Sequence, residues 1–81
     1  MRLIEEIVSW DNLVEANRLA SEKIGPDDEV ASFESNLWEN LGRLQMELLW
    51  GSYRPSAGLP AYRDIVAFCA IANVIFGGCL T

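Results

Sequence analysis

The stretch Asp27–Gly51, DDEVASFESNLWENLGRLQMELLWG, decides the expected fold. Its apolar residues recur every three or four positions, as on one face of a helix with 3.6 residues per turn: Val30, Phe33, Leu37, Leu41, Leu44 and Leu48. The three acids at 27–29 suit the N-terminal end of a helix, and Gly51 can adopt the left-handed conformation that ends one. We therefore predict a long central helix over 26–51, with the rest of the chain covering its apolar face. Three large side chains lie off this face and indicate a second packing surface: Trp38, Met46 and Trp50.

The first 25 residues are expected to form a helical hairpin arm. A short amphipathic helix is predicted within 2–8 (RLIEEIV), and Ser9 is a natural N-cap for a second helix from Trp10 to about Lys23. Gly25-Pro26 stops this helix, because Gly supplies a left-handed residue and Pro lacks the backbone N–H of the helical ladder. The short connection predicts that the second helix packs antiparallel to the long one.

After Gly51 the pattern changes. Residues 52–60 contain two Pro and one Gly and are predicted to form a loop, followed by an apolar C-terminal helix over 61–78. From Ile65 onward this helix is apolar on every side, as in a helix surrounded by other structure. The chain is thus expected to be a single all-α domain over 1–81. It would be a small bundle of three main helices plus a short N-terminal helix, completed by oligomerisation.

Composition excludes several kinds of function. Of the 81 residues 51% are hydrophobic, and 12 acids against 6 bases give a net charge of −6. The few bases are scattered, which argues against a nucleic-acid partner. The chain has no His, phosphate-binding loop or nucleophile motif, and we expect no catalytic residue, metal or cofactor. The acids at 27–29 would need further oxygen ligands to hold a metal, so they are interpreted as a helix start.

The cysteines and the C-terminal stretch leave alternatives open. Cys69 and Cys79 are ten residues apart and favour free buried thiols in a reducing cytoplasm over a disulfide or metal clip. No signal-peptide core opens the chain. Residues 65–81 are uncharged over a length that touches the lower limit for a membrane span. A membrane anchor is therefore an alternative to a buried or interface helix, although Asn73 and Gly77-Gly78 suit a span poorly.

Three residues are candidates for contact with nucleic acid. Tyr53 and Arg54 precede Pro55 in the predicted loop, and Arg63 follows at the start of the last helix. An aromatic ring can stack on a base, and a guanidinium can hold a phosphate. The alternative is a turn whose aromatic side chain fills a gap in the packing.

Two segments together resemble a known family: LIEEIVSWDNLVEANRLAS (3–21) and FESNLWENLGRLQMELLWGSYRPS (33–56). They are similar to the N-terminal region of reverse transcriptases of the retron and diversity-generating-retroelement type, over about two thirds of the chain. The matched positions are Trp10, Asn12, Leu13, Ala16, Asn40, Leu41, Leu44, Gln45, Glu47, Leu48, Gly51, Tyr53 and Pro55. Tyr62-Arg63-Asp64 and Asn73-Val74-Ile75 fit the family pattern further along.

Departures from that pattern limit what the resemblance implies. Ile65 replaces an Arg, and Phe68 and Cys69 stand where His is usual, so positions that would contact template are apolar here. The palm, with its Tyr-x-Asp-Asp carboxylates that hold two metal ions, is absent. The resemblance implies a non-catalytic relative of the fingers-side region. We expect a helical interaction module that self-associates or binds a protein through apolar helix faces. The alternatives are a nucleic-acid-binding accessory fragment of a retroelement and a small protein anchored in a membrane by residues 65–81.

Overall fold

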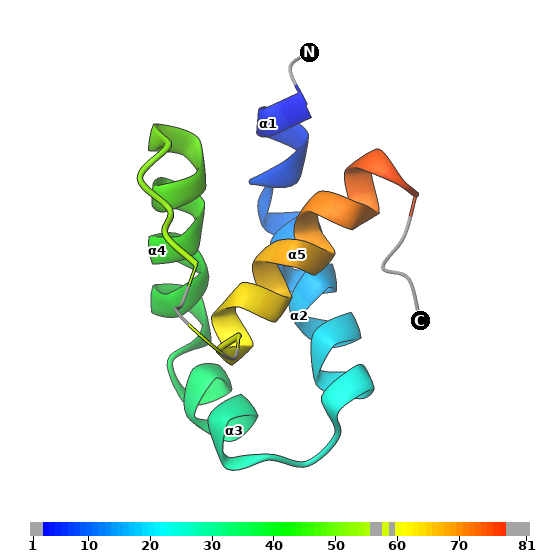
Figure 1. Cartoon of the computed structure of the whole chain (residues 1–81), viewed down its shortest axis with the longest axis vertical. Coiled ribbons are helices and arrows are strands. Elements are labelled where there is room, and N and C mark those ends of the chain that lie inside the picture. The colour runs from blue at the N-terminus through cyan, green and yellow to red at the C-terminus, as the bar shows by residue number, and fades with distance from the viewer. Residues whose placement is uncertain (1–2, 56–57, 59, 78–81) are drawn as a thin grey trace.

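The computed structural model describes residues 3–55, 58 and 60–77. Within them the chain forms five helices and no strand: α1 (Leu3–Ile7), α2 (Trp10–Ile24), α3 (Asp28–Ser35), α4 (Leu37–Trp50) and α5 (Tyr62–Ile75). The prediction of a small all-α bundle is confirmed. Figure 1 shows α2 and α4 running in opposite directions, as expected, with α3 joining them at one end and α5 crossing in front of α2.

The central helix of the bundle is α5, which corrects the expectation that the 26–51 stretch holds this place. The most extensive helix–helix contact is between α2 and α5, and α5 also packs on α1 and α3. Small residues on both helices, Ala16 and Ala20 on α2 and Ala70 on α5, are fully buried. Because these side chains are short, the two helices can approach closely and pack their larger neighbours around the crossing.

The predicted long helix over 26–51 is also wrong, because it is interrupted at Asn36 (φ −128°, ψ 48°). Side chains near this point bind backbone carbonyls that a continuous helix would use. The Ser35 hydroxyl donates to the Ser32 carbonyl (2.7 Å), and the Asn40 amide donates to the Phe33 carbonyl (2.9 Å). Ser and Asn commonly compete with the helical ladder in this way. The break turns α3 so that Phe33 packs edge-to-face on Tyr62, with ring centroids 5.1 Å apart.

The predicted helix ends at Ser9, Gly25 and Gly51 are confirmed, whereas the C-terminal helix, predicted over 61–78, ends at Ile75. The Ser9 hydroxyl accepts a hydrogen bond from the backbone N–H of Asn12 (3.3 Å), and the Asp27 carboxylate accepts one from the backbone N–H of Glu29 (2.8 Å). Gly25 (φ 81°) and Gly51 (φ 73°) follow α2 and α4 in the positive-φ region that favours Gly. These side chains and glycines satisfy backbone groups that have no partner within the helix.

Two amide side chains hold the junction between α1 and α2. The side-chain amide of Asn12 donates to the backbone carbonyls of Ile7 (2.8 Å) and Ala70 (2.9 Å), and the second bond connects this junction to α5. The Gln45 amide on α4 donates to the Val8 carbonyl (2.7 Å). Both side chains therefore join elements that are far apart in the sequence.

We expect Asn12→Ala to lower the free energy of unfolding by about 1–2 kcal/mol, because it removes two partly buried hydrogen bonds. The matched control is Asn36→Ala, whose side chain is exposed and makes no capping hydrogen bond. We expect this control to cost at most about 0.5 kcal/mol. Urea denaturation of both variants measures the difference. Equal costs for the two substitutions would contradict the role given to Asn12.

The apolar composition of the C-terminal helix predicted that other structure encloses it on every side. The structure shows that this prediction is wrong. Tyr62, Val66 and Ala70 are buried, whereas Phe68 is 61% exposed and Ile75 is 52% exposed. Cys69 is a buried thiol, as predicted, and Cys79 lies outside the described residues. Within the described part of the chain, no helix combines the length and the apolar character that crossing a membrane requires.

Candidate functional site

The candidate residues Tyr53 and Arg63 lie together, and both are engaged within the molecule. The Arg63 guanidinium lies over the Tyr53 ring, 5.1 Å from its centroid, and forms an ion pair with Glu47 on α4. The Tyr53 hydroxyl donates a hydrogen bond to the Asp64 carboxylate. Asp64 also accepts from the Ala61 amide (3.0 Å) at the start of α5. This cluster fastens the segment after α4 to the first turn of α5.

The cluster is poorly suited to bind a phosphate. Glu47 and Asp64 neutralise the positive charge that Arg63 would offer, and the second candidate cation, Arg54, is exposed one residue from the cluster. Burial, followed by the hydrogen bond to Asp64, raises the pKa of Tyr53 from its ordinary value near 10 to about 12. The side chain of Tyr53 lies between α4 and α5. This placement agrees with the alternative given above, a turn whose aromatic side chain fills a gap in the packing.

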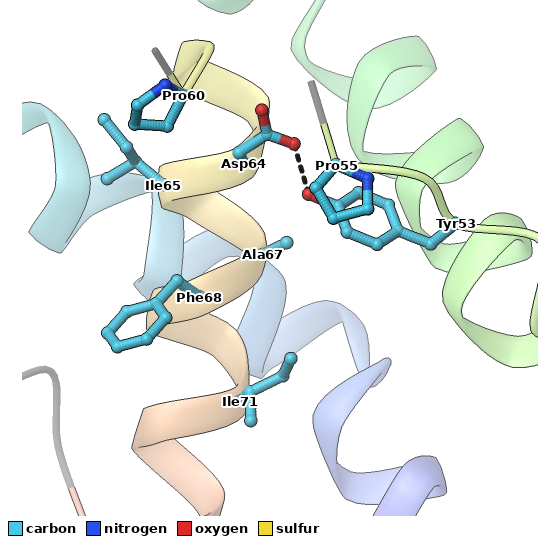
Figure 2. A pocket seen from close by; sticks show the side chains of 8 residues that line it. All are labelled: Tyr53, Pro55, Pro60, Asp64, Ile65, Ala67, Phe68 and Ile71. Atoms are coloured by element: carbon cyan, nitrogen blue, oxygen red, sulfur yellow. Dashed lines mark hydrogen bonds between the residues drawn. The ribbon is translucent and has the colours of Figure 1, made fainter. Parts of the chain in front are cut away.

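Beside this cluster, α5 and the segment before it form an apolar groove of about 390 Å³. Figure 2 shows Tyr53 and Pro55 on one side of α5, with Phe68 and Ile65 projecting from the helix. Asp64 is the charged residue of the lining, and its carboxylate points toward Tyr53. The full lining is Tyr53, Pro55, Pro60, Asp64, Ile65, Ala67, Phe68 and Ile71.

A larger apolar surface lies on α4, and we call it the α4 face. It comprises Trp38, Met46, Leu49 and Trp50, together with Trp10, whose ring packs edge-to-face on Trp38 with centroids 5.6 Å apart. At 100° per residue the four α4 side chains occupy about one third of the helix circumference. Trp38 is 64% exposed and Trp50 is 72% exposed. Exposed apolar side chains gathered in this way mark interaction sites more often than scattered ones do.

The acidic and basic residues are distributed unequally between two parts of the sequence. Residues 3–36, which hold α1 to α3, contain nine acids and two bases. Residues 37–77, which hold α4 and α5, contain three acids and three bases: Glu39, Glu47, Asp64, Arg43, Arg54 and Arg63. The part of the sequence that holds α4 and α5 is therefore electrically neutral, whereas the part that holds Trp10 of the α4 face is strongly acidic.

The resemblance aligned several polar residues without assigning roles to them, and the structure gives each a hydrogen-bond partner. Asn12, Asn40 and Gln45 donate to backbone carbonyls, Glu47 pairs with Arg63, and Tyr53 donates to Asp64. Their roles are structural. Asn12, Asn40, Gln45 and Glu47 lie inside predicted helices, so their positions in the sequence gave no signal of these partners.

No protein-family model, curated protein or solved structure matches this chain. Among the described residues, no group of three or more acidic or cysteine side chains is placed to hold a metal ion.

Proposed function

We propose that this chain is a non-catalytic helical module that associates with further copies of itself through one exposed apolar helix face. The observation that carries the proposal is that residues 37–77 combine exposed apolar side chains with balanced charges. Large apolar side chains are exposed on α4 and α5, and the charges of this segment balance. An α4 surface from each of two copies can therefore meet without a net charge on the segments that hold these helices, whereas the acidic residues 3–36 of the two copies repel one another.

The apolar content of the chain agrees with this proposal. A core of small and medium side chains forms inside a single copy, including Leu13, Leu41 and Leu44. The large residues Trp38, Trp50 and Phe68 stay outside it and contribute little to the folding of one copy. Exposed Trp and Phe are costly for solubility unless they meet a partner, and aromatic residues are enriched in protein interfaces.

The resemblance to the N-terminal region of reverse transcriptases supports an interaction role rather than a catalytic one. In the resembled proteins the catalytic carboxylates lie in a palm, outside the region that this sequence resembles. Apolar residues at positions 65, 68 and 69 replace the charged and polar residues of that family. Cys69 packs in the core of one copy, and the exposed Phe68 suits contact with protein better than contact with a nucleic acid.

Light scattering over a dilution series tests the proposal. We expect the average mass at high concentration to exceed the 9.0 kDa of one chain and to fall toward that value on dilution. The expected dependence follows from mass action at an interface that buries only the exposed apolar residues. A mass of 9.0 kDa at every concentration up to the millimolar range would contradict self-association.

A further inference from the structure

The surface that two copies would share can be inferred from the exposed areas. With roughly 200 Å² for a large apolar side chain, the exposed fractions on the α4 face leave about 550 Å² per copy. On the same scale the exposed α5 residues Phe68 and Ile75, together with Phe76 directly after the helix, leave only about 350 Å² per copy. A specific interface needs roughly 1,000 Å² in total, which two α4 faces supply and two α5 faces do not.

We propose that a second copy of this chain packs on the α4 face, with the two α4 helices antiparallel across a two-fold axis. This inference rests on the proposed function and names the surface and the geometry through which it operates. The charges beside the face suit a second copy, because Glu39 and Arg43 form an ion pair (3.8 Å) along one edge and leave that edge neutral. The acidic residues of α1 to α3 lie in the other half of the sequence and do not belong to the face.

Charge also selects the antiparallel direction. In a parallel pair about a two-fold axis, each Glu39 would approach the Glu39 of the second copy, and each Arg43 would approach the other Arg43. Like charges placed in this way repel, and parallel helix dipoles add to the cost. In the antiparallel pair the two ends of the face meet, so that Trp38 of one copy lies toward Trp50 of the other. Gly42, in the middle of α4, lies against the Trp10 ring, which a Cβ at this position would approach to 3.6 Å, so Trp10 lies near the centre of the face.

Met46 provides the test, because it is half exposed and lies near the middle of α4, close to the inferred axis. We expect Met46→Glu and Met46→Lys each to weaken self-association at least tenfold, since each places like charges near one another. An equimolar mixture of the two variants should restore a two-chain species, because opposite charges then meet. Sedimentation equilibrium measures all three samples, and circular dichroism verifies that each variant is folded.

The matched control is Phe68→Glu on α5, which changes an equally exposed residue of the other apolar face. We expect it to leave the association constant within about twofold of that of the natural chain. If Phe68→Glu abolishes association and the Met46 variants do not, the inferred surface is wrong while self-association stands. If the mixture stays monomeric although the natural chain associates, the two-fold placement is wrong. If the natural chain is monomeric throughout, both the inference and the proposed function fail.

Discussion

Leu13→Ala is expected to lower the free energy of unfolding by about 2–5 kcal/mol, the range for a leucine truncated in a close-packed core. Leu13 has no exposed surface and lies on α2, where this helix packs on α5. Truncation leaves a cavity at the crossing of these two helices, which the surrounding backbone can fill only in part. In a domain of this size the loss corresponds to a fall of at least about 10 °C in the melting temperature.

The neighbouring residue provides the matched control. Val14 also lies on α2 but is 37% exposed, and we expect Val14→Ala to cost no more than about 1 kcal/mol. Thermal unfolding followed by circular dichroism, at a concentration low enough to keep each chain monomeric, measures both. Equal melting temperatures for the two variants would contradict the placement of the core between α2 and α5.

Alkaline unfolding is the second large expected effect, and Tyr62 is its cause. The Tyr62 hydroxyl donates to the Asn17 side-chain oxygen (2.8 Å) and lies 3.1 Å from the Asn17 carbonyl oxygen. Burial, followed by the negative charge of Glu34, raises the pKa of Tyr62 from its ordinary value near 10 to about 12. The neutral phenol therefore stabilises the fold fully below pH 10, and this contribution is lost as the pH rises toward 12. A shift of this size corresponds to about 2–3 kcal/mol.

Tyr62→Phe isolates this contribution. We expect the variant to be less stable than the natural chain at pH 8 by roughly 1–2 kcal/mol, because Asn17 loses a buried hydrogen bond. The difference should shrink between pH 10 and 12, since only the natural chain has a phenol to ionise at this position. Denaturant titrations at several pH values measure it. A constant difference across this pH range would show that Tyr62 ionises no differently in the folded and unfolded chain.

Local signals in the sequence predicted most of the helix ends, because each depends on a side chain or a glycine at one position. Ser9 and Asp27 accept hydrogen bonds at the starts of α2 and α3, and Gly51 ends α4. The break at Asn36 was missed because the apolar spacing of Phe33, Leu37 and Leu41 continues across it without change. Periodicity reports which residues face the core, and here two separate helices satisfy the same period.

The apolar faces were predictable only in part. Trp38, Met46 and Trp50 lie off the main stripe in the sequence, and the structure leaves all three exposed. By contrast, α5 is apolar all around, so that no pattern could tell its buried side from the side that carries Phe68. The groove beside α5 depends on how Tyr53, Pro55 and Pro60 lie against the helix, which no local pattern in the sequence specifies.

The most direct test of the account is sedimentation equilibrium of the natural chain at low and at high salt. The account predicts a species of twice 9.0 kDa at high concentration, with tighter association at high salt, because salt screens the repulsion between the acidic residues 3–36 of the two copies while apolar contacts remain. A mass of 9.0 kDa at both salt concentrations, or association that weakens as salt rises, would contradict it.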